Sequence, residues 1–187
     1  MKKIFVLAFC LLLFLFPCSN IFAQAGLFAG FQVGYSTQKP SFKSIEFNRD
    51  DNFLYGLHAG AKFFMFAVEA NYFQATHVLK PKESFIFDWA GLKIDYRFIG
   101  LNLKYILSLL VLRPYLTVGY GYYTIDIHHV AKAKDKGYNL GLGAELVFGE
   151  RFSFLVEGKY HHVKLKIQDR TLGFGNFTLS GGMNLNF

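Results

Sequence analysis

Apolar and polar positions alternate with a period of two along most of the chain. The last segment shows the pattern most clearly. One of its faces holds Phe177, Leu179, Met183, Leu185 and Phe187, and the other holds Thr178, Ser180, Asn184 and Asn186. A period of two indicates a β-strand whose two faces meet different surroundings. The pattern predicts a two-faced strand that runs to the final residue.

The same alternation recurs upstream and predicts eight strands in all. They are centred on residues 29–36, 53–63, 66–72, 92–105, 116–123, 138–148, 153–161 and 177–187. In the fourth segment the apolar positions change from even numbers, ending at Phe98, to odd numbers, beginning at Leu101. A β-bulge adds one residue to a strand and would produce this shift. We therefore predict a bulge near Ile99 and Gly100.

The connections between these strands alternate in length. Short turns are expected at 64–65 and 149–151, and longer polar loops at 38–52, 78–88, 128–136 and 167–176. Short turns at one end and long loops at the other are typical of outer-membrane barrels, as is an even number of strands. The segment 106–112 is unusually apolar for a turn, so the boundary there stays open.

Side-chain volume indicates which face of the barrel meets lipid. A soluble barrel also alternates, but its apolar face points inward. The interior of an eight-stranded barrel is only wide enough for side chains to fill it. Here the apolar face is crowded with Phe, Tyr and Leu, whereas the other face is rich in Gly. We predict an all-β fold, an eight-stranded antiparallel up-and-down transmembrane β-barrel with its apolar face outward.

Aromatic residues at the strand ends are expected to form two girdles at the membrane interfaces. The periplasmic girdle would contain Phe63, Phe66, Tyr105, Phe148, Phe152 and Phe187, and the outer girdle Tyr35, Phe53, Tyr72, Tyr122, Tyr138 and Phe177.

The N-terminus has the features of a cleaved export signal. Lys2 and Lys3 precede an apolar run of about 13 residues, too short for a membrane helix of about 20, and Ala23-Gln24-Ala25 offers a small-x-small cleavage site. We predict a signal peptide at 1–25 and one barrel domain at 26–187. Loss of the two lysines lowers the formal charge from +7 to about +5. An exported chain has no role in binding nucleic acid.

Both cysteines, Cys10 and Cys18, fall within the predicted signal. The exported chain therefore offers no thiol for a disulfide, a thiolate metal site or a nucleophile.

The predicted interior carries a nearly balanced set of charges. These lumen candidates are Lys62, Glu69, Lys93, Asp95, Arg97, Lys104, Glu145, Glu157 and Lys159. An unpaired charge in a narrow, partly dehydrated interior costs several kcal/mol. We expect ion pairs such as Lys62 with Glu69 to stabilise and plug the barrel. The alternative is a narrow channel for ions or small solutes.

Histidines and hydroxyls offer weaker candidates for chemistry. The pairs His128-His129 and His161-His162 lie near the predicted outer rim, but adjacent strand residues point to opposite faces, so each pair supplies one metal ligand per side. We interpret them as solvent-exposed rim histidines. A lipid-A-modifying enzyme would need a nucleophile and a base within hydrogen-bond reach. No motif groups the candidates His77, His161, Asp169 and Ser180. We expect no metal, no cofactor and no enzymatic activity.

The predicted outer loops and rim are basic, with Lys80, Lys82, Lys132, Lys134, Lys136, Lys164, Lys166 and Arg170. Such a set could bind outer-membrane lipid, including the phosphates of lipopolysaccharide. A solvated loop surface is the alternative interpretation.

Two motifs and the chain ending resemble a known family. The stretches Lys93–Tyr105 (KIDYRFIGLNLKY) and Arg113–Tyr120 (RPYLTVGY) resemble the outer-membrane β-barrel domain family of the PorT and OmpX kind, with Gly100 where that family has its proline region. The resemblance implies a Gram-negative outer-membrane protein, inserted by the barrel assembly machinery through an assembly signal ending at Phe187. Our leading hypothesis is a non-enzymatic barrel with a structural or loop-mediated role, and the likeness to PorT points to a secretion accessory.

Overall fold

A computed structural model describes residues 25–38, 41–42, 45–46, 50–78, 93–109, 111–127, 131–167 and 170–187. Apart from Ala25, the predicted signal peptide lies outside the described residues. The same is true of Lys80, Lys82, His128, His129 and Asp169.

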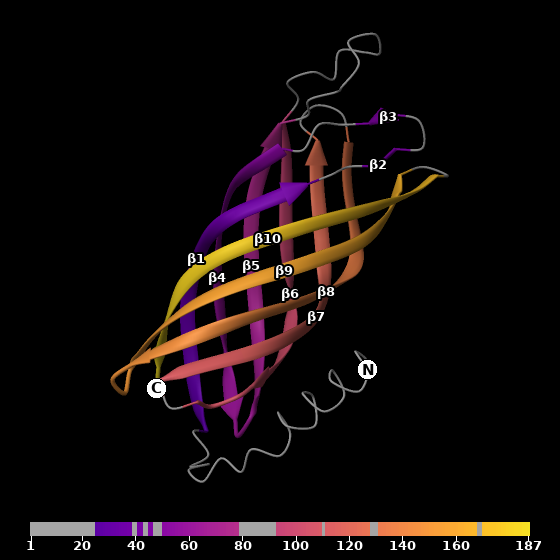
Figure 1. The fold of residues 1–187 in the computed structure, drawn as a ribbon. Helices are drawn as coiled ribbons and strands as arrows, with labels where there is room; N and C mark the ends of the chain where they lie inside the picture. Colours follow the sequence, from indigo (N-terminus) through magenta and orange to yellow (C-terminus); the bar gives the residue numbers. More distant parts are fainter. Residues whose placement is uncertain are drawn as a thin grey trace, which may run out of the picture.

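Eight long strands form a closed antiparallel barrel (Figure 1). They are β1 (Gly26–Gln38), β4 (Asp50–Phe63), β5 (Phe66–Val78), β6 (Lys93–Ile106), β7 (Leu112–Ile127), β8 (Ala131–Phe148), β9 (Phe152–Ile167) and β10 (Arg170–Asn186). Each pairs with its neighbours in the chain, and β1 closes the ring by pairing with both β4 and β10. The predicted fold is confirmed. Two short strands not predicted, β2 (Ser41–Phe42) and β3 (Ile45–Glu46), pair in the first long connection.

Tight turns close one end of the barrel. Phe64, with φ 54°, and Gly149, with φ 64°, supply the left-handed backbone that the β4–β5 and β8–β9 turns need. The apolar connection between β6 and β7 is also a tight turn, because Leu109 and Leu112 exchange two backbone hydrogen bonds of 3.0 and 3.1 Å. All three lie at the end that carries the C-terminus in Figure 1.

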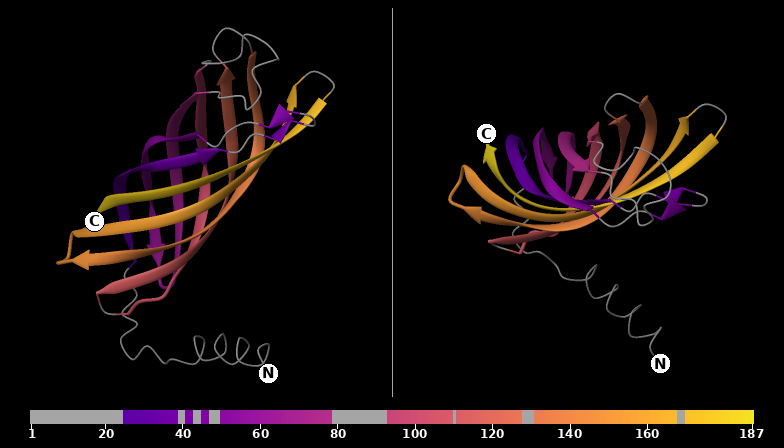
Figure 2. Two further views of the ribbon diagram at one scale, coloured as in Figure 1. Left: turned by 45° about the horizontal axis from the view of Figure 1, so that its top comes forward. Right: turned by 90° about the horizontal axis from the view of Figure 1, so that it is seen from above.

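At the opposite end the strands are longer than the alternation predicts. Strand β8 begins at Ala131 and β10 at Arg170, so strand residues occupy most of the predicted loops 128–136 and 167–176. Strands β8 and β9 pair only as far as Gly137 and Val163. Beyond that point β6–β8 and the β9–β10 hairpin diverge, as the two views of Figure 2 show.

The outer face of the barrel is apolar between two rows of aromatic residues. The row at the turn end includes Phe63, Phe66, Phe148, Phe152 and Phe187, and the row at the other end includes Tyr35, Tyr55, Tyr122, Tyr138 and Tyr160; all are exposed. The predicted girdle residues lie in or beside these rows. Among the described residues, no helix is long and apolar enough to cross a bilayer.

The predicted bulge in β6 is wrong. Strand β6 pairs with β5 without interruption from Tyr105–Phe66 to Lys93–Val78. Its even-numbered side chains therefore point inward along the whole strand, including Ile94 and Phe98. The apolar positions change parity because the surroundings of the strand change, not because its backbone gains a residue.

The interior consists of three layers. At the long-loop end lies an apolar cluster of Leu54, Phe73, Ala75, Ile94, Tyr96, Phe98, Tyr123, Ile125 and Val163. A polar layer fills the middle. A small apolar cluster of Phe28, Ala67, Ile106 and Tyr115 lies toward the turn end. Buried side chains thus occupy the barrel along its length.

Candidate functional site

The polar layer inside the barrel is the largest concentration of buried charge in the described part of the chain. It contains Lys62 of β4, Glu69 of β5, Lys104 of β6, Glu145 of β8 and both Glu157 and Lys159 of β9, each at most 9% exposed. All six project inward because their positions share the inward parity of their strands. Buried lysines and glutamates are equal in number, so the layer can neutralise itself.

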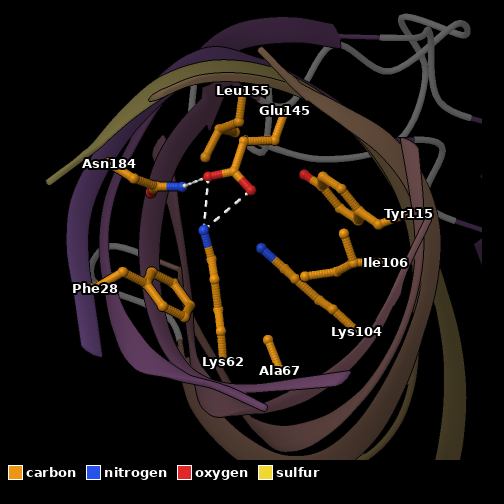
Figure 3. A pocket seen from close by; sticks show the side chains of 9 residues that line it. All are labelled: Phe28, Lys62, Ala67, Lys104, Ile106, Tyr115, Glu145, Leu155 and Asn184. Atoms are coloured by element: carbon orange, nitrogen blue, oxygen red, sulfur yellow. Dashed lines mark hydrogen bonds and ion pairs between the residues drawn. The ribbon is translucent and has the colours of Figure 1, made fainter. Parts of the chain in front are cut away.

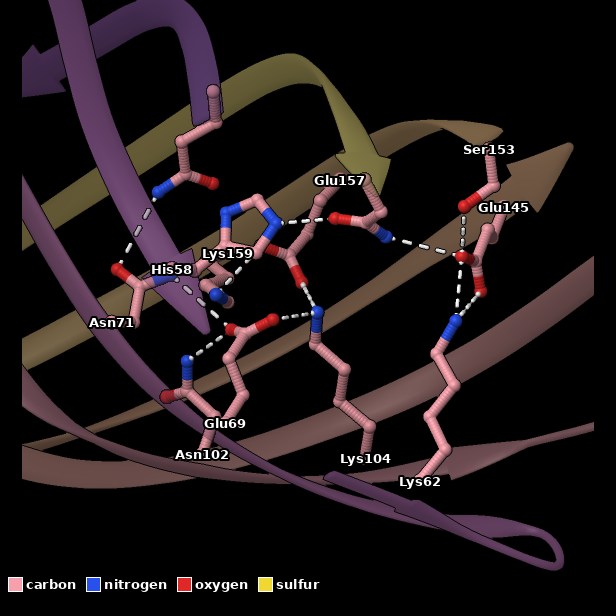
Figure 4. Close-up of polar contacts among 12 residues, drawn as sticks. His58, Lys62, Glu69, Asn71, Asn102, Lys104, Glu145, Ser153, Glu157 and Lys159 are labelled. Atoms are coloured by element: carbon pink, nitrogen blue, oxygen red, sulfur yellow. Dashed lines mark hydrogen bonds and ion pairs between the residues drawn. The ribbon is translucent and has the colours of Figure 1, made fainter. Parts of the chain in front are cut away.

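Lys62 and Glu145 form an ion pair across the full width of the lumen. Strands β4 and β8 are four positions apart in either direction around the barrel, so the two side chains start from opposite walls. Lys62 Nζ lies 2.8 Å from Oε1 and 3.0 Å from Oε2 of Glu145. Ser153 Oγ and Asn184 Nδ2 also donate to Glu145 Oε1, Asn184 at 3.1 Å (Figure 4). Three side chains from other strands, Lys62, Ser153 and Asn184, thus donate hydrogen bonds to the Glu145 carboxylate.

A second chain of charges runs beside this pair. Lys104 donates to Glu69 and lies 3.8 Å from Glu157, whose other oxygen is 2.6 Å from Lys159 Nζ. Asn102 Nδ2 donates to Glu69 Oε1 at 2.9 Å. Charges alternate in sign along the chain, which offsets the cost of dehydrating each group.

Two sequence predictions about this site are wrong. Lys62 pairs with Glu145 and not with Glu69, because long side chains in a narrow lumen reach the opposite wall. Lys93, Asp95 and Arg97 lie on the outer face of β6. There Arg97 lies 4.0 Å from Asp95 and 3.9 Å from Asp126. These three residues have odd numbers, and without a bulge the odd positions of β6 face outward.

Little space remains on the inner side of the Lys62–Glu145 pair, although Lys62 also lines a space of about 490 Å³ that opens toward the turn end. The cavity lined by these two residues with Phe28, Tyr115 and Asn184 has a volume of about 10 Å³ (Figure 3). That volume holds at most one water molecule.

Above the polar layer, the aromatic rings of the apolar cluster pack face to face or tilted. Phe98 lies 4.7 Å from Tyr123 and 5.3 Å from Phe73, measured between ring centroids. These rings place a second, apolar obstruction in series with the ion pairs.

The two adjacent histidines of β9 face opposite ways, as expected, but the predicted solvent exposure is wrong for His161, because its side chain points into the barrel. His161 is 1% exposed and its Nδ1 and Nε2 lie 3.0 Å from Tyr123 Oη and 3.2 Å from Thr178 Oγ1. The His162 ring lies on the outer face, 5.1 Å from that of Tyr138. Among the described residues, no group of three or more His, Cys, Asp or Glu side chains could hold a metal ion.

One buried serine–histidine contact was not anticipated. His77 Nε2 lies 3.2 Å from Ser36 Oγ, and Ser36 donates to Asn176 Oδ1 at 3.0 Å. All three are at most 2% exposed. The Ser36 hydroxyl is therefore enclosed between the amide and the imidazole and is not accessible from the surface. The sequence did contain a signal for this contact, because Ser36 and Asn176 occupy inward-facing positions at the outer ends of β1 and β10.

The outer face changes character along one row of paired residues. Tyr72, Ile99 and Tyr122 lie side by side on the outside of β5, β6 and β7, and Phe73, Phe98 and Tyr123 lie side by side on the inside. Beyond this row the outward residues are polar: Gln74, Thr76, Asp95, Arg97, Thr124 and Asp126. An apolar interior with a polar exterior is the arrangement of a protein in water. The barrel therefore leaves the lipid at this row.

Known proteins share this architecture. The family model of the outer membrane protein beta-barrel domain matches residues 8–185. The crystal structure of Neisserial surface protein A (NspA) superposes with a TM-score of 0.68 at 12% identity, covering 86% of this chain and 97% of that one. The N-terminal barrel domain of Pseudomonas aeruginosa OprF gives a TM-score of 0.51 at 15% identity, covering 88% of this chain and 100% of that one.

The attachment invasion locus protein Ail of Yersinia pestis gives a TM-score of 0.50 at 14% identity, covering 86% of this chain and 98% of that one. At these identities the similarity concerns the fold alone. No curated protein sequence matches the chain.

Proposed function

Since the chain belongs to the outer membrane protein β-barrel domain family, in agreement with the resemblance of its motifs, we propose that it is a closed, non-enzymatic barrel. Family and fold indicate the bacterial outer membrane as its location. In this proposal the barrel anchors the outer extensions of β5–β8 and the loops above them, and conducts neither ions nor solutes.

The Lys62–Glu145 ion pair carries this proposal. A channel needs a continuous path for water, and this pair crosses the lumen where the adjoining cavity is only about 10 Å³. The aromatic cluster around Phe98 and Tyr123 adds an apolar segment in series. An ion would have to separate the charges and then pass the rings.

The polar groups favour a structural role over catalysis. Ser36 and His77 are buried together with Asn176, so a substrate does not reach the hydroxyl. His161 is enclosed by three aromatic rings. A hydrolase would need such a pair at a surface that a substrate reaches.

The outer end of the barrel is the part available for partners. Strands β5–β8 project beyond the row of Tyr72, Ile99 and Tyr122, where the barrel leaves the lipid. They would present their loops to another protein. The name of Ail refers to attachment, a contact role that a closed barrel with long outer extensions could also have. A secretion-accessory role would use the same surface.

The C-terminal strand supports insertion by the barrel assembly machinery. The Phe187 amide donates to Leu27 O at 2.8 Å, which joins the last residue to β1 at the closing seam. The Phe187 side chain is 72% exposed. In this proposal that ring and the apolar face of β10 form the assembly signal.

Planar-bilayer recording tests the closed state. We expect no single-channel steps from the folded wild-type barrel, with folding verified by the mobility shift between unboiled and boiled samples. The comparison uses Glu145→Gln, inside the lumen, and Lys93→Gln, on the outer face. Reproducible wild-type steps that change in size with Glu145→Gln and not with Lys93→Gln would overturn the proposal in favour of a channel.

A further inference from the structure

Two lysines of β8 lie on the outer face where the barrel leaves the lipid. Lys136 pairs with Tyr122, so it continues the row formed by Tyr72, Ile99 and Tyr122. Lys134 is the next outward residue and pairs with Thr124. Both lysines are exposed.

Both ammonium groups are held against the same tyrosine ring. Lys134 Nζ lies 4.7 Å and Lys136 Nζ 5.6 Å from the ring centroid of Tyr122. A cation over a tyrosine face is attracted by the ring electrons. Tyr122 belongs to the outer aromatic row, which lies at the depth of lipid headgroups. The two positive charges are thus positioned at that depth.

The nearby carboxylates are engaged elsewhere. Asp126 lies 3.9 Å from Arg97 and 3.8 Å from Lys132. The Asp135 carboxylate accepts from the backbone amide of Lys136 at 2.8 Å. Within the described part of the chain, neither Lys134 nor Lys136 has an ion pair with a carboxylate. Within that part, the positive charge of these two lysines is therefore left without a carboxylate partner.

The outward lysine of the neighbouring strand, Lys164 of β9, lies apart from these two lysines. Strands β8 and β9 stop pairing at Gly137 and Val163, one residue before Lys136 and Lys164, and beyond that point the β9–β10 hairpin diverges from β8. Lys134 and Lys136 alone therefore form the positively charged pair just above the aromatic row.

We propose that Lys134 and Lys136 bind the phosphate groups of a phosphorylated glycolipid of the outer leaflet, as in lipopolysaccharide. Ammonium groups donate charge-assisted hydrogen bonds to phosphate oxygens, and the aromatic row below packs against the lipid. This site goes beyond the closed-barrel proposal and does not depend on the state of the lumen.

Binding of bisphosphorylated lipid A to the folded barrel, purified from outer membranes into detergent, tests the site by native mass spectrometry. We expect the double variant Lys134→Gln/Lys136→Gln to weaken binding about 25-fold, since each lysine near an anionic lipid surface contributes a factor of about five. The wild-type barrel should lose a similar factor with chemically dephosphorylated lipid A.

Two further variants control for charge and folding. Lys93→Gln/Arg151→Gln removes the same charge away from Tyr122 and should bind like the wild type. Lys134→Arg/Lys136→Arg keeps the charge and should retain binding. Equal affinity in the Lys134/Lys136 glutamine variant and the wild type, equal weakening in the control double variant, or undiminished binding of dephosphorylated lipid would each overturn the site. None of these variants changes a lumen residue. The outcome of the lipid-binding test is therefore independent of the outcome of the bilayer recordings.

Discussion

Phe98 of β6 and Tyr123 of β7 face each other inside the barrel at 4.7 Å, while the next pair along the same two strands, Ile99 and Tyr122, faces outward. At this level both faces of the sheet are apolar. One face packs in the interior and the other meets the edge of the lipid. Toward the turn end the outside of β5, β6 and β7 is apolar and the polar layer lies inside, whereas toward the long-loop end their outside is polar and the apolar cluster lies inside.

Alanine at Phe98 and at Ile99 should therefore have very different effects. Phe98→Ala removes a side chain that is 1% exposed and should destabilise the barrel by about 3–5 kcal/mol. Ile99 is 60% exposed at the lipid edge, so Ile99→Ala should cost less than about 1.5 kcal/mol. Reversible urea unfolding in lipid vesicles measures both. Equal losses would contradict the inward orientation of Phe98.

Single cysteine substitutions on β6 also test which side chains face outward, with a reagent added outside the cell. Cys10 and Cys18 lie in the predicted signal, so we expect the exported background to have no thiol. A membrane-impermeant maleimide should label Arg97→Cys, which is exposed to water, but neither Tyr96→Cys, which is buried, nor Leu101→Cys, which faces lipid. A bulged strand would put position 97 in the lumen and protect it. Labelling at Leu101 and not at Arg97 would contradict the structure.

Sequence alternation predicted the strand count and the outward apolar face because lipid imposes one rule on every strand. It could not predict β6, since a bulge and a reversal of surroundings produce the same order of apolar residues. The distinguishing signal was present in the neighbours. Tyr72-Phe73, Phe98-Ile99 and Tyr122-Tyr123 are all adjacent apolar pairs. The three pairs lie in one row only because of the strand register, which cannot be deduced from the sequence alone.

The contacts inside the lumen are likewise only partly predictable from the sequence. Parity along β4, β5 and β8 correctly directs Lys62, Glu69 and Glu145 inward, but partner choice depends on the width of the barrel. Lys62 and Glu145 are 83 residues apart and meet only because β4 and β8 lie opposite each other. No local spacing in the chain encodes that contact.

A double-mutant cycle measures how strongly this pair is coupled. Lys62→Met leaves the Glu145 carboxylate buried without its cation, and Glu145→Leu leaves the ammonium without its anion. Each single variant should lose about 3–5 kcal/mol of unfolding free energy. The double variant, with both charges replaced by apolar groups, should be more stable than either single variant. Additive losses, measured by urea unfolding in vesicles, would show that the two groups do not interact.

Two glycines, Gly119 inside the barrel and Gly181 outside it, differ in the space available for an added methyl group. A Cβ at Gly119 would lie 2.5 Å from Asn139 Nδ2 and 2.8 Å from Asn139 Oδ1. It would displace the Asn139–Asn102 hydrogen bond of 3.3 Å, and Asn102 in turn donates to Glu69. Gly119→Ala should therefore destabilise the barrel by about 1–3 kcal/mol.

At Gly181 the nearest atom to an added Cβ is Leu155 O at 3.7 Å, an ordinary contact. Gly181→Ala should be neutral or stabilise the strand by up to about 1 kcal/mol, because alanine has less backbone freedom to lose on folding. Urea midpoints of the two variants, compared at equal slopes, separate these outcomes. A Gly119→Ala barrel as stable as the wild type would show that the lumen can admit a methyl group beside the asparagine pair. The packing argument for a closed interior would then lose its support at this level.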